Sequence, residues 1–362
     1  MKKIVIIALV SILSIQFIKA QNSNNNHKNS IDLDLIIKTN DVNIGGTLTI
    51  PINLAIPSLV IMTSGSGPQD RDETLEDFKI FKILADHLAS KGVASFRYDD
   101  RGVNKSTGDF VNSTIEDHSK DLESIMHYFK VSQNYTFKSF IMFGHSQGGI
   151  LAAKVAVGNE SVEKVILMGA PAVPLVEVVL YQVRQEYNQA NISKALIEAH
   201  VSAHNKLMKS IEDDKHFDEA YQLFKLTTES ILHELNLESK TDSKKIKRQA
   251  IAQTDEFKII YALPSLTSFL YYDPSADYER LEVPVLGLFG GMDFQVTIDQ
   301  NKDRMENALL ESGTKYDFLT FENANHFFQK ATSGTRDKNI TREKKFVANF
   351  LNEISDWILA FK

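Results

Sequence analysis

Short apolar runs alternate with segments of helical spacing in two parts of this 362-residue chain. In the first part we expect strands and helices in turn at residues 31–38, 45–50, 58–63, 76–90 (helix), 94–98, 115–131 (helix), 139–143, 148–157 (helix) and 162–168. In the second part the expected elements are strands 283–289 and 316–321 and helices 298–310 and 342–361. Strands that alternate with helices form parallel β-α-β units. The pattern therefore predicts an α/β fold with a mostly parallel central sheet flanked by helices.

A long helical and charged stretch, with few strand signals, separates the two parts. Because it lies between two consecutive strands of the expected sheet, the simplest interpretation is a helical cap inserted before the last two strands. Such folds bind ligands at the carboxyl edge of the sheet, and a cap would cover that edge. We predict core residues 31–171, a cap of residues 172–281, and a second core segment of residues 282–362.

The N-terminus has the pattern of an export signal. Lys2 and Lys3 precede the apolar residues 4–18, and Ala20 precedes a polar tract. This order is typical of a secretory signal peptide, which would occupy residues 1–20, be cleaved after Ala20 and leave a polar linker of residues 21–30. An uncleaved anchor is the alternative, but the run is shorter than the ~20 residues that a spanning helix needs. We expect a periplasmic or secreted protein with no stable membrane insertion after cleavage.

The charge and residue composition exclude several partners and cofactors. A net charge of −7 argues against nucleic acid as a main partner. The sequence has no cysteine, which excludes disulfides, thiolate metal sites and a cysteine nucleophile. His200 and His204 have a spacing that could bind a metal, but the glutamate and third ligand of a metalloprotease pattern are missing. We interpret the two histidines as part of the cap surface, and we expect no metal and no organic cofactor.

Residues 144–148 read Gly-His-Ser-Gln-Gly and lie between an apolar strand and a helix of small residues. This is a G-x-S-x-G motif in the strand-turn-helix context that gives the motif its meaning. A serine on so sharp a turn has strained backbone angles, and Gly144 and Gly148 supply the space that the turn needs. We predict Ser146 as a nucleophile and the backbone amide of Gln147 as a donor to an oxyanion.

Two later loops supply the partners of such a serine. A serine hydroxyl needs a base, and the base needs an acid that orients it. His326 follows the last expected strand, and Asp293 follows the strand after the helical stretch. Because each lies in the first loop after its strand, both should reach the sheet edge of Ser146. We predict His326 as base and Asp293 as acid, and disfavour Asp273 and Glu322 because neither follows a strand at the expected place.

The second oxyanion donor is expected in the loop of residues 63–72, whose small residues allow backbone amides to approach a substrate oxygen. We favour Ser66, with Gly65 as the next choice. The loop of residues 98–106 is interpreted as structural, with one of its two aspartates, Asp99 and Asp100, pairing with Arg101 or Arg71.

Several stretches together carry a family resemblance: residues 65–73, the loop of residues 98–106, the Gly-His-Ser-Gln-Gly motif and Tyr-Asp-Pro at residues 272–274. In this order they resemble the serine aminopeptidase S33 / EstD-like esterase branch of bacterial α/β hydrolases. The resemblance implies an α/β-hydrolase fold with a helical cap, a carboxylic-ester hydrolase, and a catalytic triad at Ser146, Asp293 and His326. Asn104 departs from the branch, which usually has glycine at that place.

The resulting prediction is a serine hydrolase that cleaves small-molecule carboxylic esters through an acyl-enzyme on Ser146. Apolar positions of the expected cap suit a short hydrophobic acyl chain; they include Leu180, Tyr181, Phe224 and Leu270. Carboxylates of the same stretch, among them Glu177, Glu186 and Glu198, could instead bind an α-amino group, as in a serine aminopeptidase. A non-catalytic binding protein of this fold is the alternative from a different class. The intact motif and triad favour the enzyme.

Overall fold

The computed structural model describes residues 30–135, 137–236, 242–334 and 343–360. These residues form two compact units, an α/β unit made of the described residues up to 173 and from 273 onward, and a helical unit of residues 174–272. The predicted signal peptide lies outside the described residues, as does the predicted linker except for Ser30, which begins the first strand. None of the described helices is both long enough and apolar enough to span a membrane.

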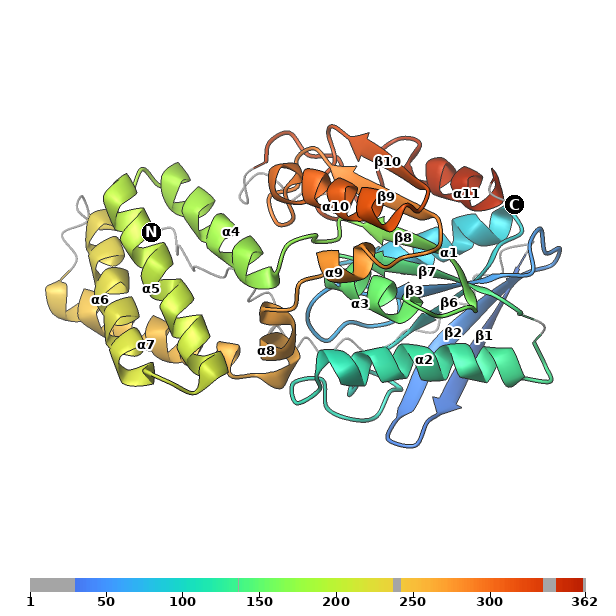
Figure 1. The fold of residues 1–362 in the computed structure, drawn as a ribbon, viewed down its shortest axis with the longest axis horizontal. Helices are drawn as coiled ribbons and strands as arrows, with labels where there is room; N and C mark the ends of the chain where they lie inside the picture. Colours follow the sequence, from blue (N-terminus) through green and yellow to red (C-terminus); the bar gives the residue numbers. More distant parts are fainter. Residues whose placement is uncertain (1–29, 136, 237–241, 335–342, 361–362) are drawn as a thin grey trace. The chain divides into compact units, whose positions relative to one another are not determined.

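The α/β unit is built on a mixed sheet whose described strands have the order β1-β2-β6-β3-β7-β8-β9-β10 (Figure 1). The strands are β1 (Ser30–Lys38), β2 (Asn43–Pro51), β3 (Leu59–Thr63), β6 (Ala94–Tyr98), β7 (Phe140–His145), β8 (Val162–Met168), β9 (Val285–Gly290) and β10 (Tyr316–Phe321). β2 pairs antiparallel with β1 and with β6, and every later pair is parallel. The prediction of a mostly parallel central sheet flanked by helices is confirmed.

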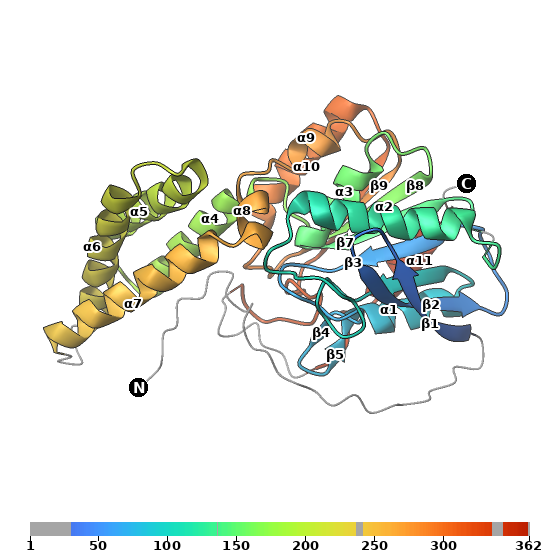
Figure 2. The same cartoon turned by 90° about the horizontal axis from the view of Figure 1, so that it is seen from below.

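Helices cover both faces of this sheet, and its central strands β3 and β7 are accordingly almost entirely apolar, whereas β6 also contains Ser95 and Arg97. α2 (Ile115–Val131) and α3 (Gln147–Ala156) pack together on one face, and α1 (Ile80–Ser90) packs with α11 (Phe350–Ala360) on the other (Figure 2). All residues of β3, β6 and β7 are buried. A strand that is covered on both faces has no solvent side, so it reads as a continuous apolar run.

Two helices begin later than the sequence pattern predicts. Residues 76–79 are not helical: β4 (Thr74–Leu75) and β5 (Phe78–Lys79) form a small antiparallel hairpin, and α1 begins only at Ile80. The last helix begins at Phe350, and the described residues 343–349 are not helical. Here Phe346 pairs with Gln329 in an isolated bridge, and Asn349 has φ 65°. The apolar residues of both segments are still buried in the core. The helical spacing therefore predicted their burial correctly, but it predicted the wrong backbone conformation.

The helical unit contains α4 (Leu175–Gln189), α5 (Lys194–Asp213), α6 (Phe217–Leu235), α7 (Ser243–Tyr261) and α8 (Pro264–Leu270). His200 and His204 on α5 lie in its interior with exposed fractions of 3% and 1%, so their interpretation as a surface was wrong. Both rings pack against Phe224 of α6, with centroid distances of 4.9 and 4.7 Å. No group of three or more potential metal ligands occurs among the described residues. That this stretch is a cap with bounds 172–281 stays a prediction.

Hydrogen bonds within the α/β unit fix the two chain segments that flank the helical unit. The hydroxyl of Tyr278, in α9 (Ser275–Tyr278), donates a hydrogen bond to the backbone oxygen of Pro171 at 2.8 Å. Near it, the amide of Ala172 donates to Asn301 in α10 (Ile298–Ser312) at 2.8 Å. The chain therefore leaves and re-enters the α/β unit at neighbouring points.

Candidate active site

Ser146 lies on a one-residue turn between β7 and α3 and has φ 53° and ψ −123°. Non-glycine residues rarely adopt such angles, and they do so mainly at functional sites. The flanking glycines are required by space. A Cβ on Gly144 would lie 2.3 Å from the backbone oxygen of Gly148, and one on Gly148 would lie 2.3 Å from that of Thr63. The sequence motif thus corresponds to a tight turn that presents Ser146 at the carboxyl end of a central strand.

Asp293 and His326 meet at the same edge, because β9 and β10 are parallel neighbours. Oδ2 of Asp293 lies 2.7 Å from Nδ1 of His326, and both residues are buried. Oδ1 accepts the backbone amides of Gln295 at 2.7 Å and Val296 at 2.9 Å. A carboxylate held in this way accepts the Nδ1 hydrogen, which leaves the lone pair of Nε2 free to accept a proton.

The two rival acids are engaged elsewhere or exposed. Asp273 accepts hydrogen bonds from Ser275 and pairs with Arg304 at 3.0 Å. Glu322 is exposed. Asp293 is therefore the one of these three carboxylates that contacts His326.

His145 and Gly65 show that the serine turn, the histidine loop and the loop after β3 converge. The ring centroids of His145 and His326 lie 4.8 Å apart. A Cβ on Gly65 would lie 3.2 Å from the Cβ of Ser146. The loop of residues 63–72 therefore runs directly beside Ser146.

Two backbone amides beside Ser146 have no hydrogen-bond acceptor among the described residues. One belongs to Gln147, the first residue of α3, and the other to Ser66. The amide of Gly65, by contrast, donates to Oε1 of Glu73 at 2.8 Å. Unsatisfied amides at a helix start and on a close loop can bind an oxyanion, so the geometry favours Ser66 over Gly65.

An ion pair and a hydrogen bond hold the loop after β3 to the loop after β6. Nε of Arg71 donates to Asp99 at 3.1 Å, as the sequence analysis expected for one aspartate of this loop. Asp100 accepts the backbone amide of Gln69 at 2.9 Å, and its burial raises the pKa of its carboxyl well above the usual range. Arg101 points to another partner, Asp121, at 2.7 Å. Both aspartates therefore support the loop that carries Ser66.

Sequence reasoning missed two buried residues of this site, Glu73 and His145. Oε1 of Glu73 lies 2.7 Å from Nδ1 of His145. Burial acts to lower the pKa of His145, but Glu73, with smaller contributions from the backbone of His326 and from Asp293, raises it overall. His145 occupies the variable position of the motif, and Glu73 follows two other acidic residues in a polar loop. The one sequence signal for the pair is the position of Glu73, an acidic residue shortly after the Gly-rich residues 65–67.

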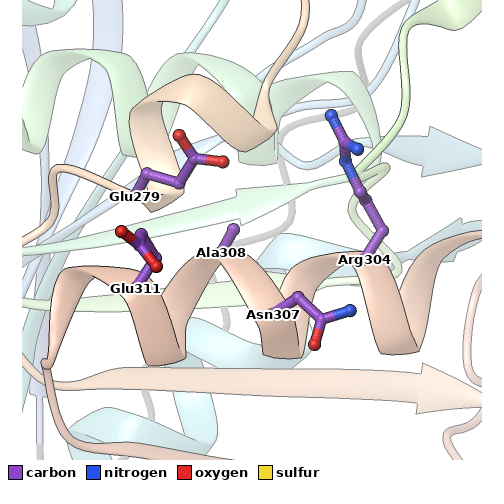
Figure 3. A pocket seen from close by; sticks show the side chains of 5 residues that line it. All are labelled: Glu279, Arg304, Asn307, Ala308 and Glu311. Carbon is purple, nitrogen blue, oxygen red and sulfur yellow. The ribbon is translucent and has the colours of Figure 1, made fainter.

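A separate groove lies between α9 and α10 (Figure 3). Its lining residues are Glu279, Arg304, Asn307, Ala308 and Glu311. In Figure 3 four of these project from α10, and Glu279 lies opposite them at the end of α9. None of them belongs to the Ser146 site.

The fold and the serine turn define an α/β hydrolase, and comparison with known proteins agrees. The family model "serine aminopeptidase, S33" matches residues 75–263, and that of the dienelactone hydrolase family matches residues 269–358. The chain belongs to the S33 serine aminopeptidase family of α/β hydrolases.

Named relatives and solved structures are similar over most of the chain. Esterase EstD from Thermotoga maritima is 24% identical over 318 residues, which cover 87% of this chain and 65% of EstD. The chain thus spans less than two thirds of the length of this curated relative. A Pyrococcus furiosus esterase is 13% identical with a TM-score of 0.53, covering 85% of this chain and 87% of its own. Proline iminopeptidase from Mycobacterium smegmatis is 12% identical with a TM-score of 0.50, covering 91% and 97%. The solved structures support the fold.

Proposed function

We propose that the protein is a serine carboxylesterase that hydrolyses small-molecule esters through an acyl-enzyme on Ser146. The observation that supports this most is the position of Ser146 on its strained turn at the edge where Asp293 and His326 form a 2.7 Å hydrogen bond. The esterase names of the Thermotoga and Pyrococcus relatives support an ester as the substrate class.

In the proposed reaction, Nε2 of His326 takes the proton of Ser146 as Oγ attacks the ester carbonyl carbon. The carbonyl oxygen becomes an oxyanion and accepts hydrogen bonds from the amides of Gln147 and Ser66. The imidazolium then gives its proton to the departing alcohol. Water, activated by the same histidine, hydrolyses the acyl-enzyme, and Asp293 keeps the ring oriented and stabilises its positive charge.

A fluorophosphonate probe tests the nucleophile directly, because it reacts with activated serines. We expect labelling at Ser146 alone, and we expect Ser146→Ala to lose both labelling and ester hydrolysis while its circular dichroism is unchanged. Labelling that persists in this variant would overturn the assignment. An unlabelled wild-type protein would favour the non-catalytic binding protein.

The ratio of two substrates separates esterase from aminopeptidase. We expect short-chain p-nitrophenyl esters to be cleaved at pH 7 to 8, and amino-acid p-nitroanilides hardly at all. Esters have the better leaving group, so the deciding figure is the ratio of the two kcat/KM values. Anilide turnover comparable to that of the ester would favour the peptidase.

We further propose that the protein is exported, on the support of the basic and apolar pattern of residues 1–20. The mass and N-terminal sequence of the protein recovered from its native cells test this. Cleavage after Ala20 is expected, and a full-length cytoplasmic protein would contradict the proposal.

A further inference from the structure

Each ring nitrogen of the buried His145 faces a hydrogen-bond acceptor. Nδ1 lies 2.7 Å from Oε1 of Glu73, and Nε2 lies 3.1 Å from the backbone oxygen of His326. A carbonyl oxygen only accepts, so Nε2 carries a hydrogen and donates it to His326. A lone pair on Nδ1 would repel the carboxylate at 2.7 Å, so a second proton lies between Nδ1 and Glu73.

Glu73 extends this connection to the loop after β3. The same Oε1 accepts the backbone amide of Gly65 at 2.8 Å. Hydrogen bonds therefore run from Gly65 through Glu73 and His145 to the backbone of His326. They join three separate segments of the chain, because 72 positions separate Glu73 from His145 and 181 positions separate His145 from His326.

The burial and backbone conformation of Glu73 destabilise the folded state. Its exposed fraction is 4%, its Oε2 is buried without a hydrogen-bond partner among the described residues, and its φ is 46°. An orphaned carboxylate oxygen and a left-handed backbone both cost free energy. Such features persist where the surrounding structure enforces them, and they cluster at functional sites.

The groups that face His145 explain why it can hold a positive charge. Glu73 is its ion-pair partner, Asp293 adds a second negative charge, and the rings of His326 and Phe327 pack against it. Burial lowers the pKa of His145, but the charge and hydrogen bond of Glu73, together with the backbone oxygen of His326 and the charge of Asp293, raise it overall. One proton therefore lies in the 2.7 Å contact between Nδ1 of His145 and Oε1 of Glu73.

We propose that Glu73 and His145 are positioning residues of the active site, and this inference rests on the proposed ester hydrolysis. Glu73 holds the amide of Gly65, so that the adjacent amide of Ser66 faces the site. His145 holds the backbone of His326 and thereby the place of its ring. Because an oxyanion donor and a general base act in the transition state, loss of their positions lowers kcat more than it raises KM.

Two near-isosteric variants test this, with the exposed Glu76, in the turn of the nearby β4–β5 hairpin, as the matched control. Glu73→Gln removes the charge, and His145→Phe keeps a ring against His326 but removes both hydrogen bonds. For each we expect kcat and the rate of fluorophosphonate labelling to fall about 10- to 100-fold, with KM within about twofold of wild type. The double variant should be no slower than the slower single variant, because the two residues act as one unit. Glu76→Gln should behave as wild type.

Circular dichroism and thermal unfolding establish that each variant is folded, and if Glu73→Gln is not folded, His145→Phe decides. Wild-type kcat in a folded variant, a loss confined to KM, or multiplied losses in the double variant would overturn the inference. A wild-type protein that neither reacts with the probe nor cleaves esters would instead overturn the proposed function.

Discussion

Asp293 and His326 form a 2.7 Å hydrogen bond although 33 positions separate them in the chain. The contact exists because β9 and β10 are parallel neighbours that pair in register from Val285 with Tyr316 to Gly290 with Phe321. Each residue lies in the loop after its strand, so sheet topology alone brings the carboxylate to the imidazole.

We predict that Asp293→Asn lowers kcat about 10⁴-fold with little change in stability, because an asparagine amide favours the wrong histidine tautomer. Steady-state kinetics with a short-chain ester measure the loss. Asp299→Asn, an exposed position on α10, is the control and should be neutral. Turnover near the wild-type value in Asp293→Asn would place the orienting acid elsewhere.

Gly148→Ala should disrupt the serine turn. The new Cβ would lie 2.3 Å from the oxygen of Thr63 and 2.4 Å from that of Ser64, and both are backbone atoms that cannot move alone. We expect a destabilisation of about 1–3 kcal/mol and a loss of labelling at Ser146. Urea unfolding measures the first effect. Gly334→Ala, where no atom of the described residues apart from its chain neighbours lies within 4 Å of the added carbon, should be neutral. Equal midpoints for the two variants would contradict the steric argument.

Asp99→Ala should destabilise the α/β unit by about 3–5 kcal/mol, because it leaves the largely buried Arg71 without its main counter-charge. The Asp99 side chain is fully buried, and that of Arg71 is 12% exposed. Burial lowers the pKa of Arg71, but Asp99, with Asp34 and Asp72, raises it overall. The urea midpoint tests the prediction, with exposed Asp303→Ala on α10 as the control. A shift no larger than that of the control would show that the pair adds nothing.

The buried histidines should make stability fall in mild acid. Burial lowers the pKa of His200 to about 4, and burial lowers that of His118 in the α/β unit to about 4. Burial and the neighbouring His200 lower the pKa of His204 well below its usual value. A histidine with a lowered folded pKa stabilises fully above its unfolded pKa of about 6.5, and that stabilisation is lost as pH falls toward the folded pKa. For His200 the loss at pH 5 is about 2 kcal/mol.

We therefore expect His200→Phe to flatten the pH dependence of the free energy of unfolding between about pH 6.5 and pH 4. Urea unfolding at pH 7 and pH 5 measures it for both proteins. Exposed His127→Phe on α2 should keep the wild-type dependence. An unchanged dependence in His200→Phe would show that His200 is not buried as a neutral ring.

Several elements could be predicted residue by residue from apolar spacing. The bounds of β6, β8, β10 and α2 agree with the expected ranges 94–98, 162–168, 316–321 and 115–131. β6 and β8 are almost wholly buried, α2 buries one side, and β10 is a half-buried strand at the edge of the sheet. In each element the spacing of the apolar residues follows from the covered side, so pattern and structure have the same cause. Asn104, the departure from the family pattern, has φ 43°, a conformation that glycine adopts freely and asparagine tolerates.

The failures have a common physical origin in long-range contacts. Helical spacing at residues 342–349 reflects burial of Phe346 against Phe78 and Phe350, and a bridged loop achieves the same burial. Polarity alone cannot show that His200 and His204 are enclosed by aromatic rings of other helices. The Glu73–His145 pair joins residues 72 positions apart, and no local pattern reports such a contact.

The hydrogen bond from Tyr278 to Pro171 has a consequence for how such enzymes diversify. It joins the two chain segments that flank the helical unit, so the inserted residues begin and end at neighbouring positions and form a closed loop with respect to the α/β unit. The entropy of closing a loop grows only with the logarithm of its length, and each doubling costs about 0.6 kcal/mol. Insertions of very different length at this junction therefore change the free energy of folding only slightly through loop closure. The strands that precede Ser146, Asp293 and His326 can stay unchanged. The inserted segment can then change in length and sequence during evolution without any change in the residues at the sheet edge.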